Sequence, residues 1–272
     1  MLFGGLVFSL NLLDGGMVAT SVAAFVLFCM LSSAVYLVND LLDLERDRQH
    51  PTKRLRPLAA GVITPPLAVG LAAALFAFAV PLAFALDWPF GAVAGAYVVL
   101  MVGYSLALKN VVIIDLFCIA GGFVLRAIAG AIVIDVRISP WLLICTALLA
   151  LFLVLGKRRH ELLLLEDGAA NHRRILAEYS TPLIEELISV VTSATVIAYS
   201  LYTFFSETSH EHGRYMMLTI PFVVYAIFRY LYLVHRRNEG GNPDQLLFKD
   251  VPLLVSIVLW AVAATLILYG LS

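Results

Sequence analysis

Charge is scarce in this sequence. Asp, Glu, Lys and Arg account for 14% of the 272 residues, whereas 61% of the residues are hydrophobic and the mean hydropathy is +0.94. A soluble domain needs far more charge to cover its surface. Long polar segments are also missing, which excludes a separate soluble domain. We therefore expect one integral membrane domain over residues 1–272.

Cysteine is rare, and neither sign of charge dominates. The cysteines Cys29, Cys118 and Cys145 lie inside apolar stretches and lack the spacing of metal ligands, so we expect them to be small packing residues. The formal net charge is −1. A nucleic-acid partner is therefore not indicated, because such partners require a basic surface.

Long apolar blocks dominate the chain, each near the roughly 20 residues that a helix needs to cross a bilayer. They run roughly over 17–38, 62–86, 89–108, 112–134, 139–156, 183–205, 215–234 and 252–271. A shorter apolar piece over 1–13 would reach about 20 Å as a helix, against a hydrocarbon core of about 30 Å. We expect a partial first span there. The predicted fold is an all-α, polytopic membrane bundle of about nine helices, the first one short.

The basic residues predict the orientation of this bundle. Fourteen Lys and Arg residues fall on alternate connections, whereas the opposite connections hold only Arg137 and Arg214. The positive-inside rule places the basic side in the cytoplasm. We expect a multi-pass protein of the plasma membrane whose active site faces the cytoplasm.

The most informative stretch, residues 39–57, follows the block over 17–38. Asp40, Asp43 and Asp47 are spaced i, i+3 and i+7, which puts three carboxylates on one helix face. Such carboxylates repel one another unless a hard cation binds them. Mg²⁺ is commonly held by a few carboxylates together with substrate phosphates.

A basic turn follows the three aspartates. Pro51 and Pro57 are expected to end the helix and to bring Lys53, Arg54 and Arg56 round in a compact turn. Arginine can form bidentate hydrogen bonds to two phosphate oxygens, whereas lysine acts as a point charge. The pattern predicts a Mg²⁺–diphosphate site. The alternative is a solvated loop whose acids and bases pair with one another.

Two further clusters lie on the same predicted side. Tyr104, Lys109 and Asp115 bracket another connection, although residues of these types are also common interface anchors. Lys157 and Arg158 begin the predicted loop over 157–182, and Lys157 is four residues before Glu161. These residues are candidates for phosphate binding. A surface ion pair is the alternative for the second cluster.

Two arginines fall inside apolar spans. An ionised group there is costly unless it faces a wet cavity or a partner. Arg126 lies about three turns from the predicted cytoplasmic end of its span and is expected to point into a cavity open on that side. Arg229 lies nearer the end of its span, where its side chain could simply extend to the membrane surface.

The string Asn39-Asp40-x-x-Asp43-x-x-x-Asp47 resembles the first aspartate-rich motif of the UbiA superfamily of intramembrane prenyltransferases. The resemblance implies a nine-helix bundle with a cavity open to the cytoplasm and to lipid. One branch, the decaprenyl-phosphate phosphoribosyltransferases, is more similar. The strings that carry this similarity lie at 33–40, 50–61, 122–130, 139–141 and 156–161. The aromatic prenyltransferases have a second motif of the form DxxxD where this chain reads Lys157-x-x-x-Glu161.

This resemblance implies the transfer of 5-phosphoribose from 5-phosphoribosyl 1-diphosphate (PRPP) to a decaprenyl-type polyprenyl phosphate, with Mg²⁺ as cofactor and cell-wall biosynthesis as the setting. Asp40 and Asp43 would hold the metal with Asp47 and Asn39. Phosphate binding would fall to the basic turn, to Tyr104 and Lys109, and to Arg126, Lys157 and Arg158.

Two alternatives remain open at this point. The first is prenyl transfer from a polyprenyl diphosphate to an aromatic or other small acceptor, against which Lys157 argues because it replaces a metal-binding acid. The second is a transporter. Transporters place ionisable groups near the membrane midplane and show inverted repeats, whereas this chain gathers its charges at one surface.

Overall fold

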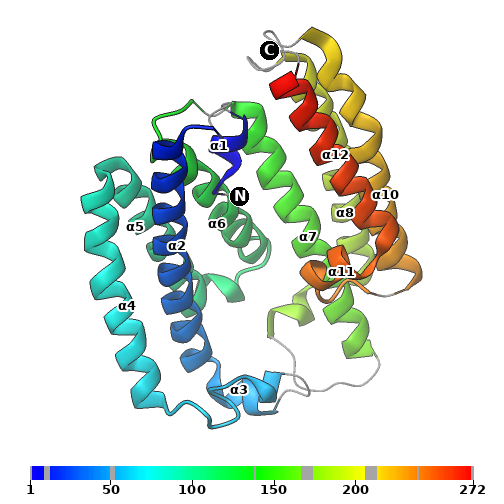
Figure 1. The fold of residues 1–272 in the computed structure, drawn as a ribbon. Helices are drawn as coiled ribbons and strands as arrows, with labels where there is room; N and C mark the ends of the chain where they lie inside the picture. The colour runs from blue at the N-terminus through cyan, green and yellow to red at the C-terminus, as the bar shows by residue number, and fades with distance from the viewer. Residues whose placement is uncertain are drawn as a thin grey trace. The chain divides into compact units, whose positions relative to one another are not determined.

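The computed structural model describes residues 2–8, 13–49, 53–137, 139–166, 174–205, 213–237 and 239–270. Over these residues every regular element is a helix, as Figure 1 shows. The helices long and apolar enough to cross a membrane are Gly15–Leu42, Pro65–Leu86, Trp88–Leu106, Ile114–Ile132, Pro140–Leu163, Thr181–Phe205, Tyr215–Arg236 and Val251–Tyr269. The all-α prediction and the eight predicted blocks are confirmed.

The chain divides into two compact units. Unit 1 comprises Met1–Arg137 and Ala170–Ile175, and unit 2 comprises Ile138–Ala169 and Leu176–Ser272. The single membrane domain expected from the sequence stays a prediction.

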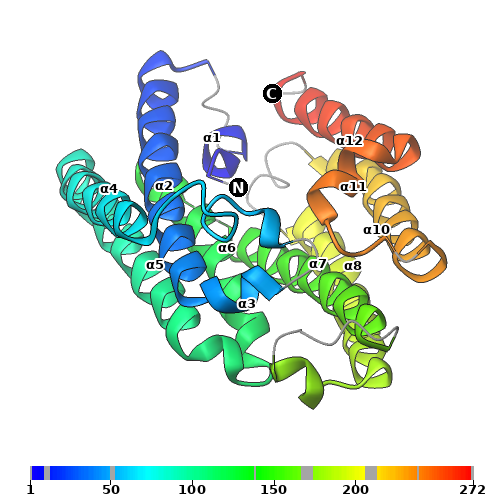
Figure 2. The same ribbon diagram turned by 90° about the horizontal axis from the view of Figure 1, so that it is seen from below.

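Unit 1 is built around the long helix α2. Its elements are α1 (Gly4–Phe8), α2 (Gly15–Leu42), α3 (Leu44–Gln49), the turn η1 (Lys53–Leu55), α4 (Pro65–Leu86), α5 (Trp88–Leu106), the turn η2 (Leu108–Asn110) and α6 (Ile114–Ile132). Helix α2 packs along α4 and α5, and α5 also packs on α6 (Figure 2). The short α1 packs mainly against α6 and lies within the segment expected to be a partial first span.

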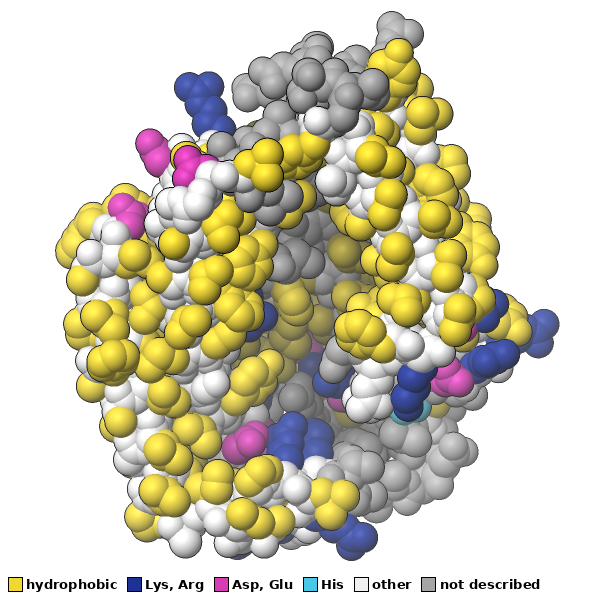
Figure 3. Space-filling view, viewed as in Figure 1, with side chains coloured by type: hydrophobic (Ala, Val, Ile, Leu, Met, Phe, Trp, Pro, Cys, Tyr) yellow, Lys and Arg dark blue, Asp and Glu magenta, His cyan; other side chains and the backbone are white. Residues whose placement is uncertain are grey.

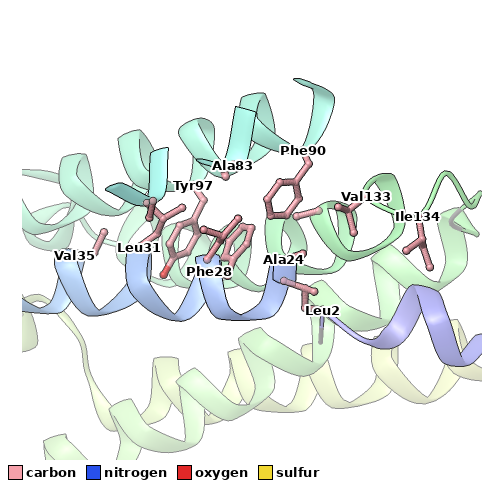
Figure 4. Close-up of a cluster of buried hydrophobic side chains, with 14 of the residues drawn as sticks. Leu2, Ala24, Phe28, Leu31, Val35, Ala83, Phe90, Tyr97, Val133 and Ile134 are labelled. Atoms are coloured by element: carbon pink, nitrogen blue, oxygen red, sulfur yellow. The ribbon is translucent and has the colours of Figure 1, made fainter. Parts of the chain in front are cut away.

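The core of unit 1 contains aromatic, branched aliphatic and small side chains (Figure 4). The Phe28 ring lies 5.8 Å from that of Phe90 and 5.2 Å from that of Tyr97, measured between centroids. Ala24 and Ala83 are buried beside them. Small side chains let helix backbones approach closely, which is the usual source of packing between membrane helices.

Side-chain caps mark where the helices of unit 1 begin. Asp14 accepts hydrogen bonds from the backbone N–H groups of Gly16 at 2.8 Å and Met17 at 3.0 Å. Asp87 accepts one from the N–H of Phe90 at 2.8 Å. A carboxylate at this position satisfies backbone donors that the first turn of a helix leaves without partners. The starts of α2 and α5 are therefore encoded locally.

Unit 2 contains the remaining spans. Its elements are α7 (Pro140–Glu166), the part of η3 (Arg174–Glu178) from Leu176 onward, α8 (Thr181–Phe205), η4 (Gly213–Thr219), α10 (Ile220–Arg236), α11 (Pro243–Lys249) and α12 (Val251–Gly270). Helix α7 packs along α8, and α10 packs along α12. The Tyr199 hydroxyl lies 2.6 Å from the Thr219 hydroxyl and accepts a hydrogen bond of 2.7 Å from the Trp260 indole, which joins α8, η4 and α12.

An ion pair between Arg229 and Asp250 links α10 to the start of α12. Its guanidinium donates to both carboxylate oxygens of Asp250, at 3.0 and 2.8 Å, and lies 5.1 Å from the centre of the Tyr232 ring. The same Asp250 carboxylate accepts a hydrogen bond of 2.9 Å from the N–H of Leu253. These bonds from Arg229 and Leu253 hold the pKa of Asp250 below its ordinary value. Arg229 therefore has a structural partner in the fold.

The contact between α1 and α6 should depend on Gly130. A Cβ atom at this position would overlap the carbonyl oxygen of Leu2. We expect Gly130→Ala to lower the thermal unfolding temperature in detergent, because overpacking of a tight contact costs about 1–3 kcal/mol. Gly70→Ala is the control, since a Cβ there meets nothing within 4 Å. Equal unfolding temperatures for the two variants would contradict this account.

The ion pair at Asp250 should make stability depend on pH. Because the pKa of Asp250 is lowered on folding, its contribution is complete above the ordinary value of about 3.9 and is lost as the pH falls through the lowered value. We expect Asp250→Asn, which keeps a capping side chain, to unfold at a lower temperature than the wild type at pH 7. The difference should shrink below pH of about 4.

Thermal unfolding at a series of pH values measures this difference. Arg236→Gln is the control, because Arg236 is an exposed residue of α10, the helix that carries Arg229. A difference between Asp250→Asn and the wild type that stays constant with pH would exclude the ionised pair as its cause.

Candidate metal and phosphate site

The three aspartates lie where α2 passes into α3. Helical hydrogen bonding continues through the junction, with Asp43 N–H donating to the Asn39 carbonyl at 3.0 Å and Asp47 N–H donating to the Asp43 carbonyl at 2.8 Å. Only Asp43 departs from helical geometry, with φ −99° and ψ 4°. The spacing that places Asp40, Asp43 and Asp47 on one side is therefore retained.

The basic turn folds back toward these aspartates. The N–H of Arg56 donates to the Lys53 carbonyl at 2.9 Å, and the N–H of Ala60 donates to the Arg56 carbonyl at 2.8 Å. Gly61 has φ +78°, a left-handed conformation that glycine adopts without strain. Residues 50–52, which include the predicted helix stop at Pro51, lie outside the described residues.

Arg56 bridges two of the aspartates. Its Nη1 donates to Asp40 Oδ1 at 2.8 Å and to Asp47 Oδ2 at 2.7 Å. Asp47 is buried, Arg56 and Lys53 are half-buried, and Arg54 is exposed. Arg56, a predicted cation of the turn, is thus bonded to two of the aspartates.

Lys109 brings the connection between α5 and α6 to the same place. Its Nζ donates to Asp43 Oδ1 at 2.7 Å, across 66 positions of sequence, and Lys109 is only 6% exposed. Arg46 is a more distant partner, with Nη1 at 3.9 Å from Asp43 Oδ1. The structure thus unites the first aspartate motif with a residue that sequence analysis placed in a separate cluster.

A strained turn separates Lys109 from α6. Ile113 has φ 69°, and the N–H of Ile114 donates to the Val112 carbonyl at 2.8 Å. This is a γ-turn of the rare, strained form, and a β-branched residue seldom adopts it. Asp115 follows in the first turn of α6 and is fully buried. Nothing in the local sequence signals such a turn.

A cavity of about 440 Å³ adjoins the Asp43–Lys109 pair. Its lining includes Leu41, Leu42, Leu44, Leu106, Ser105 and Asn110. Figure 3 shows hydrophobic side chains over the outer faces of α2 and α4, and acidic and basic side chains side by side near α3. The lining therefore combines leucine side chains with the charged residues Asp43, Glu45, Arg46 and Lys109.

The residues at this junction fit a hard cation. The atoms of Asp40, Asp43 and Asp47 that could bind a metal are carboxylate oxygens. Beside them, Asn39 Oδ1 is buried without a hydrogen-bond partner. Among the described residues no group of three or more acidic, histidine or cysteine side chains is arranged to hold a metal. Mg²⁺ needs no such cage, because it is usually bound by one or two carboxylates together with substrate phosphates and water.

Arg126 has aromatic partners inside unit 1. Its Nη2 donates to the Tyr97 hydroxyl at 2.7 Å, and its guanidinium carbon lies 5.1 Å from the Tyr97 ring centre and 5.3 Å from that of Phe123. The Tyr97 hydroxyl lies 3.1 Å from Ser32 Oγ. Over the described residues no carboxylate pairs with Arg126, so its charge is available to an anion.

The candidates in unit 2 lie on a helix, which corrects the loop expected from residue 157. Helix α7 continues to Glu166 because residues 157–166 contain strong helix formers and neither Gly nor Pro. Arg158 Nη1 donates to Glu161 Oε2 at 2.6 Å, and Arg158 is buried whereas Lys157 is exposed.

Two structural residues of unit 2 were missed by the sequence analysis. Arg159 donates to the Val234 carbonyl at 3.0 Å and to Glu185 Oε1 at 3.3 Å. Asp250 pairs with Arg229 and caps α12. A signal for Asp250 was present, since an aspartate followed at once by Val251 and Pro252 is typical of a helix start.

The chain is similar to known membrane proteins over most of its length. The model of the UbiA prenyltransferase family matches residues 2–250. Decaprenyl-phosphate phosphoribosyltransferase of Corynebacterium glutamicum is 38% identical over 250 residues, covering 90% of this chain and 75% of the relative. The enzyme of the same name from Mycolicibacterium smegmatis is 33% identical over 245 residues, covering 87% and 76%.

A solved structure shares the fold. A UbiA homolog from Archaeoglobus fulgidus, bound to GPP and Mg²⁺, superposes with a TM-score of 0.71 at 16% identity, covering 92% of this chain and 87% of that one. The match over residues 2–250 and the identity to the two curated relatives establish the family. This chain is a multi-pass membrane protein that belongs to the UbiA prenyltransferase family.

Proposed function

We propose that this protein transfers 5-phosphoribose from PRPP to a decaprenyl-type polyprenyl phosphate and releases diphosphate. The observation that carries the proposal is the gathering of Asp40, Asp43 and Asp47 with Arg56 and Lys109 at the end of apolar helices. Metal ligands and phosphate-binding cations there suit a diphosphate, and the membrane spans suit a lipid acceptor. The names of the two curated relatives support the same reaction.

Each group of residues has a proposed task. Asp40 and Asp43 would hold Mg²⁺, with Asp47 and Asn39 as further candidate ligands, and the ion would supply positive charge to neutralise the diphosphate. Diphosphate oxygens are bound by the basic turn, through Lys53, Arg54 and Arg56, by Tyr104 near the end of α5, and by Lys109 in the connection between α5 and α6. Arg126 in unit 1, and Lys157 and Arg158 in unit 2, are further candidates for binding phosphate oxygens. Glu161 orients Arg158, and Asp115 is a further candidate in the first turn of α6.

The reaction makes modest chemical demands on the protein. The bond between ribose C1 and the diphosphate oxygen breaks, and a bond forms between C1 and an oxygen of the acceptor phosphate. That acceptor oxygen is already anionic, so no strong base is needed. Catalysis then comes from positioning and from stabilising the charge that develops on the leaving group. We place the site on the cytoplasmic face of the plasma membrane, because the basic connections lie on that side.

The metal ligands can be tested by removing one charge at a time. We expect Asp40→Asn and Asp43→Asn each to lower Mg²⁺-dependent transfer by at least about 10²-fold, the scale of losing one electrostatic contact to the transition state. Purified protein in detergent would receive labelled PRPP, a polyprenyl phosphate and Mg²⁺, and label would be followed into the lipid phase.

Glu186→Gln is the matched control, because Glu186 is an exposed carboxylate on α8. A parallel assay with a prenyl diphosphate as donor separates phosphoribosyl transfer from prenyl transfer. Near-normal labelling by both aspartate variants would exclude the metal assignment. Activity with the prenyl donor alone would exclude the phosphoribosyl donor.

Arg126 should serve as an anion anchor in the apolar part of unit 1. We expect Arg126→Gln to lower kcat/KM about 10- to 100-fold, because a hydrogen bond to a charged group is worth about 1.5–3 kcal/mol. Arg126→Lys should lose less, since it keeps the charge but not the planar stacking on Tyr97 and Phe123. Steady-state kinetics with each substrate varied in turn measures both effects. Equal activity of Arg126→Gln and wild type would remove Arg126 from the site.

A further inference from the structure

We infer that Arg56 and Lys109 act as internal counterions that hold the three aspartates until a metal–diphosphate complex arrives. The divalent cation then binds weakly alone and tightly only together with diphosphate. The inference rests on the proposed function for the presence of a metal–diphosphate site. It adds the order and coupling of binding at that site.

Every aspartate of the motif already holds a cation. Arg56 lies 2.8 Å from Asp40 and 2.7 Å from Asp47, and Lys109 lies 2.7 Å from Asp43. A metal ion that takes these carboxylates must displace cations at hydrogen-bond distance. Free Mg²⁺ therefore competes with side chains that the fold itself supplies.

Burial makes this competition unfavourable for a metal ion that arrives alone. Lys109 is 6% exposed and Asp47 is 5% exposed. An ammonium group that loses its partner in such a place stays charged and poorly hydrated, which is costly. The neighbouring pair of Arg48 and Glu45 has a contact of the same length, 2.8 Å, but both side chains are well exposed, so water can replace either partner.

Diphosphate removes the obstacle by providing new partners. As the metal takes the carboxylates, the phosphate oxygens can accept hydrogen bonds from Arg56 and Lys109, so each cation exchanges one anion for another. Arginine and lysine both bind phosphate oxygens well. The cavity of about 440 Å³ beside Asp43 and Lys109 offers an incoming anion space at one of these cations.

The exchange predicts reciprocal coupling. If diphosphate raises the affinity for the metal, the metal must raise the affinity for diphosphate by the same factor. Removing a counterion should then have opposite effects on the two ligands. The free metal should bind more tightly because its competitor is gone, and diphosphate should bind more weakly because it has lost a cation.

Two titrations of the full-length protein in detergent test this. The first measures Mn²⁺ binding without diphosphate, from the loss of the electron paramagnetic resonance signal of free Mn²⁺. The second measures binding of labelled inorganic diphosphate by equilibrium dialysis at fixed Mn²⁺. We expect Arg56→Gln and Lys109→Met to bind Mn²⁺ about tenfold more tightly than wild type, and diphosphate about tenfold more weakly, the scale of one charged hydrogen bond.

Arg48→Gln is the matched control and should leave both affinities unchanged. Arg56→Gln keeps the test decisive if Lys109→Met fails to fold, because Arg56 is only half-buried. A merely structural role would weaken both ligands together. The inference is overturned if the variants bind Mn²⁺ no more tightly than wild type, or if both affinities fall.

The outcome separates this inference from the proposed function. Opposite shifts in the two affinities without phosphoribosyl transfer to lipid would support the counterion exchange and reject the donor. Normal transfer from PRPP without opposite shifts would reject the exchange and leave the proposed function intact.

Discussion

The contact between Lys109 and Asp43 holds the candidate site together. Lys109 is buried, and a buried ammonium group is stable only with an anion beside it. Asp43 supplies that anion from the junction of α2 and α3, at 2.7 Å. Arg56 extends the same network to Asp40 and Asp47. The junction of α2 and α3, the turn that follows it and the distant residue Lys109 thereby form one electrostatic group, which sets where a metal or a phosphate can bind.

The spans could be predicted from sequence because the bilayer leaves few alternatives. A helix that satisfies its own backbone hydrogen bonds and reaches across hydrocarbon needs a long apolar run, and each of the eight runs proved to be a helix. The end of α7 was predicted wrongly at residue 156. Hydropathy falls at Lys157, but helical hydrogen bonding does not require apolar residues, so the helix continues to Glu166.

The candidate site was only partly predictable. Helical spacing was enough to group Asp40, Asp43 and Asp47, because that grouping is local. The choice of Arg56 over Arg54 as their partner depends on how the turn after η1 folds, and no spacing rule gives it. The reach of Lys109 to Asp43 depends on tertiary packing across 66 positions. The positive φ of Ile113 runs against its side-chain type, and the sequence holds no signal for it.

The length of α7 has a consequence for the groups it carries. Its 27 residues span about 40 Å, which exceeds the hydrocarbon thickness of about 30 Å. Arg158 and Glu161 are thus held by a rigid rod, and their direction is set by helical phase, at about 100° per residue. A single inserted or deleted residue upstream would rotate both groups by that angle. Within this fold, the direction in which these two side chains point can therefore change through insertion or deletion of a residue in α7 as well as through substitution.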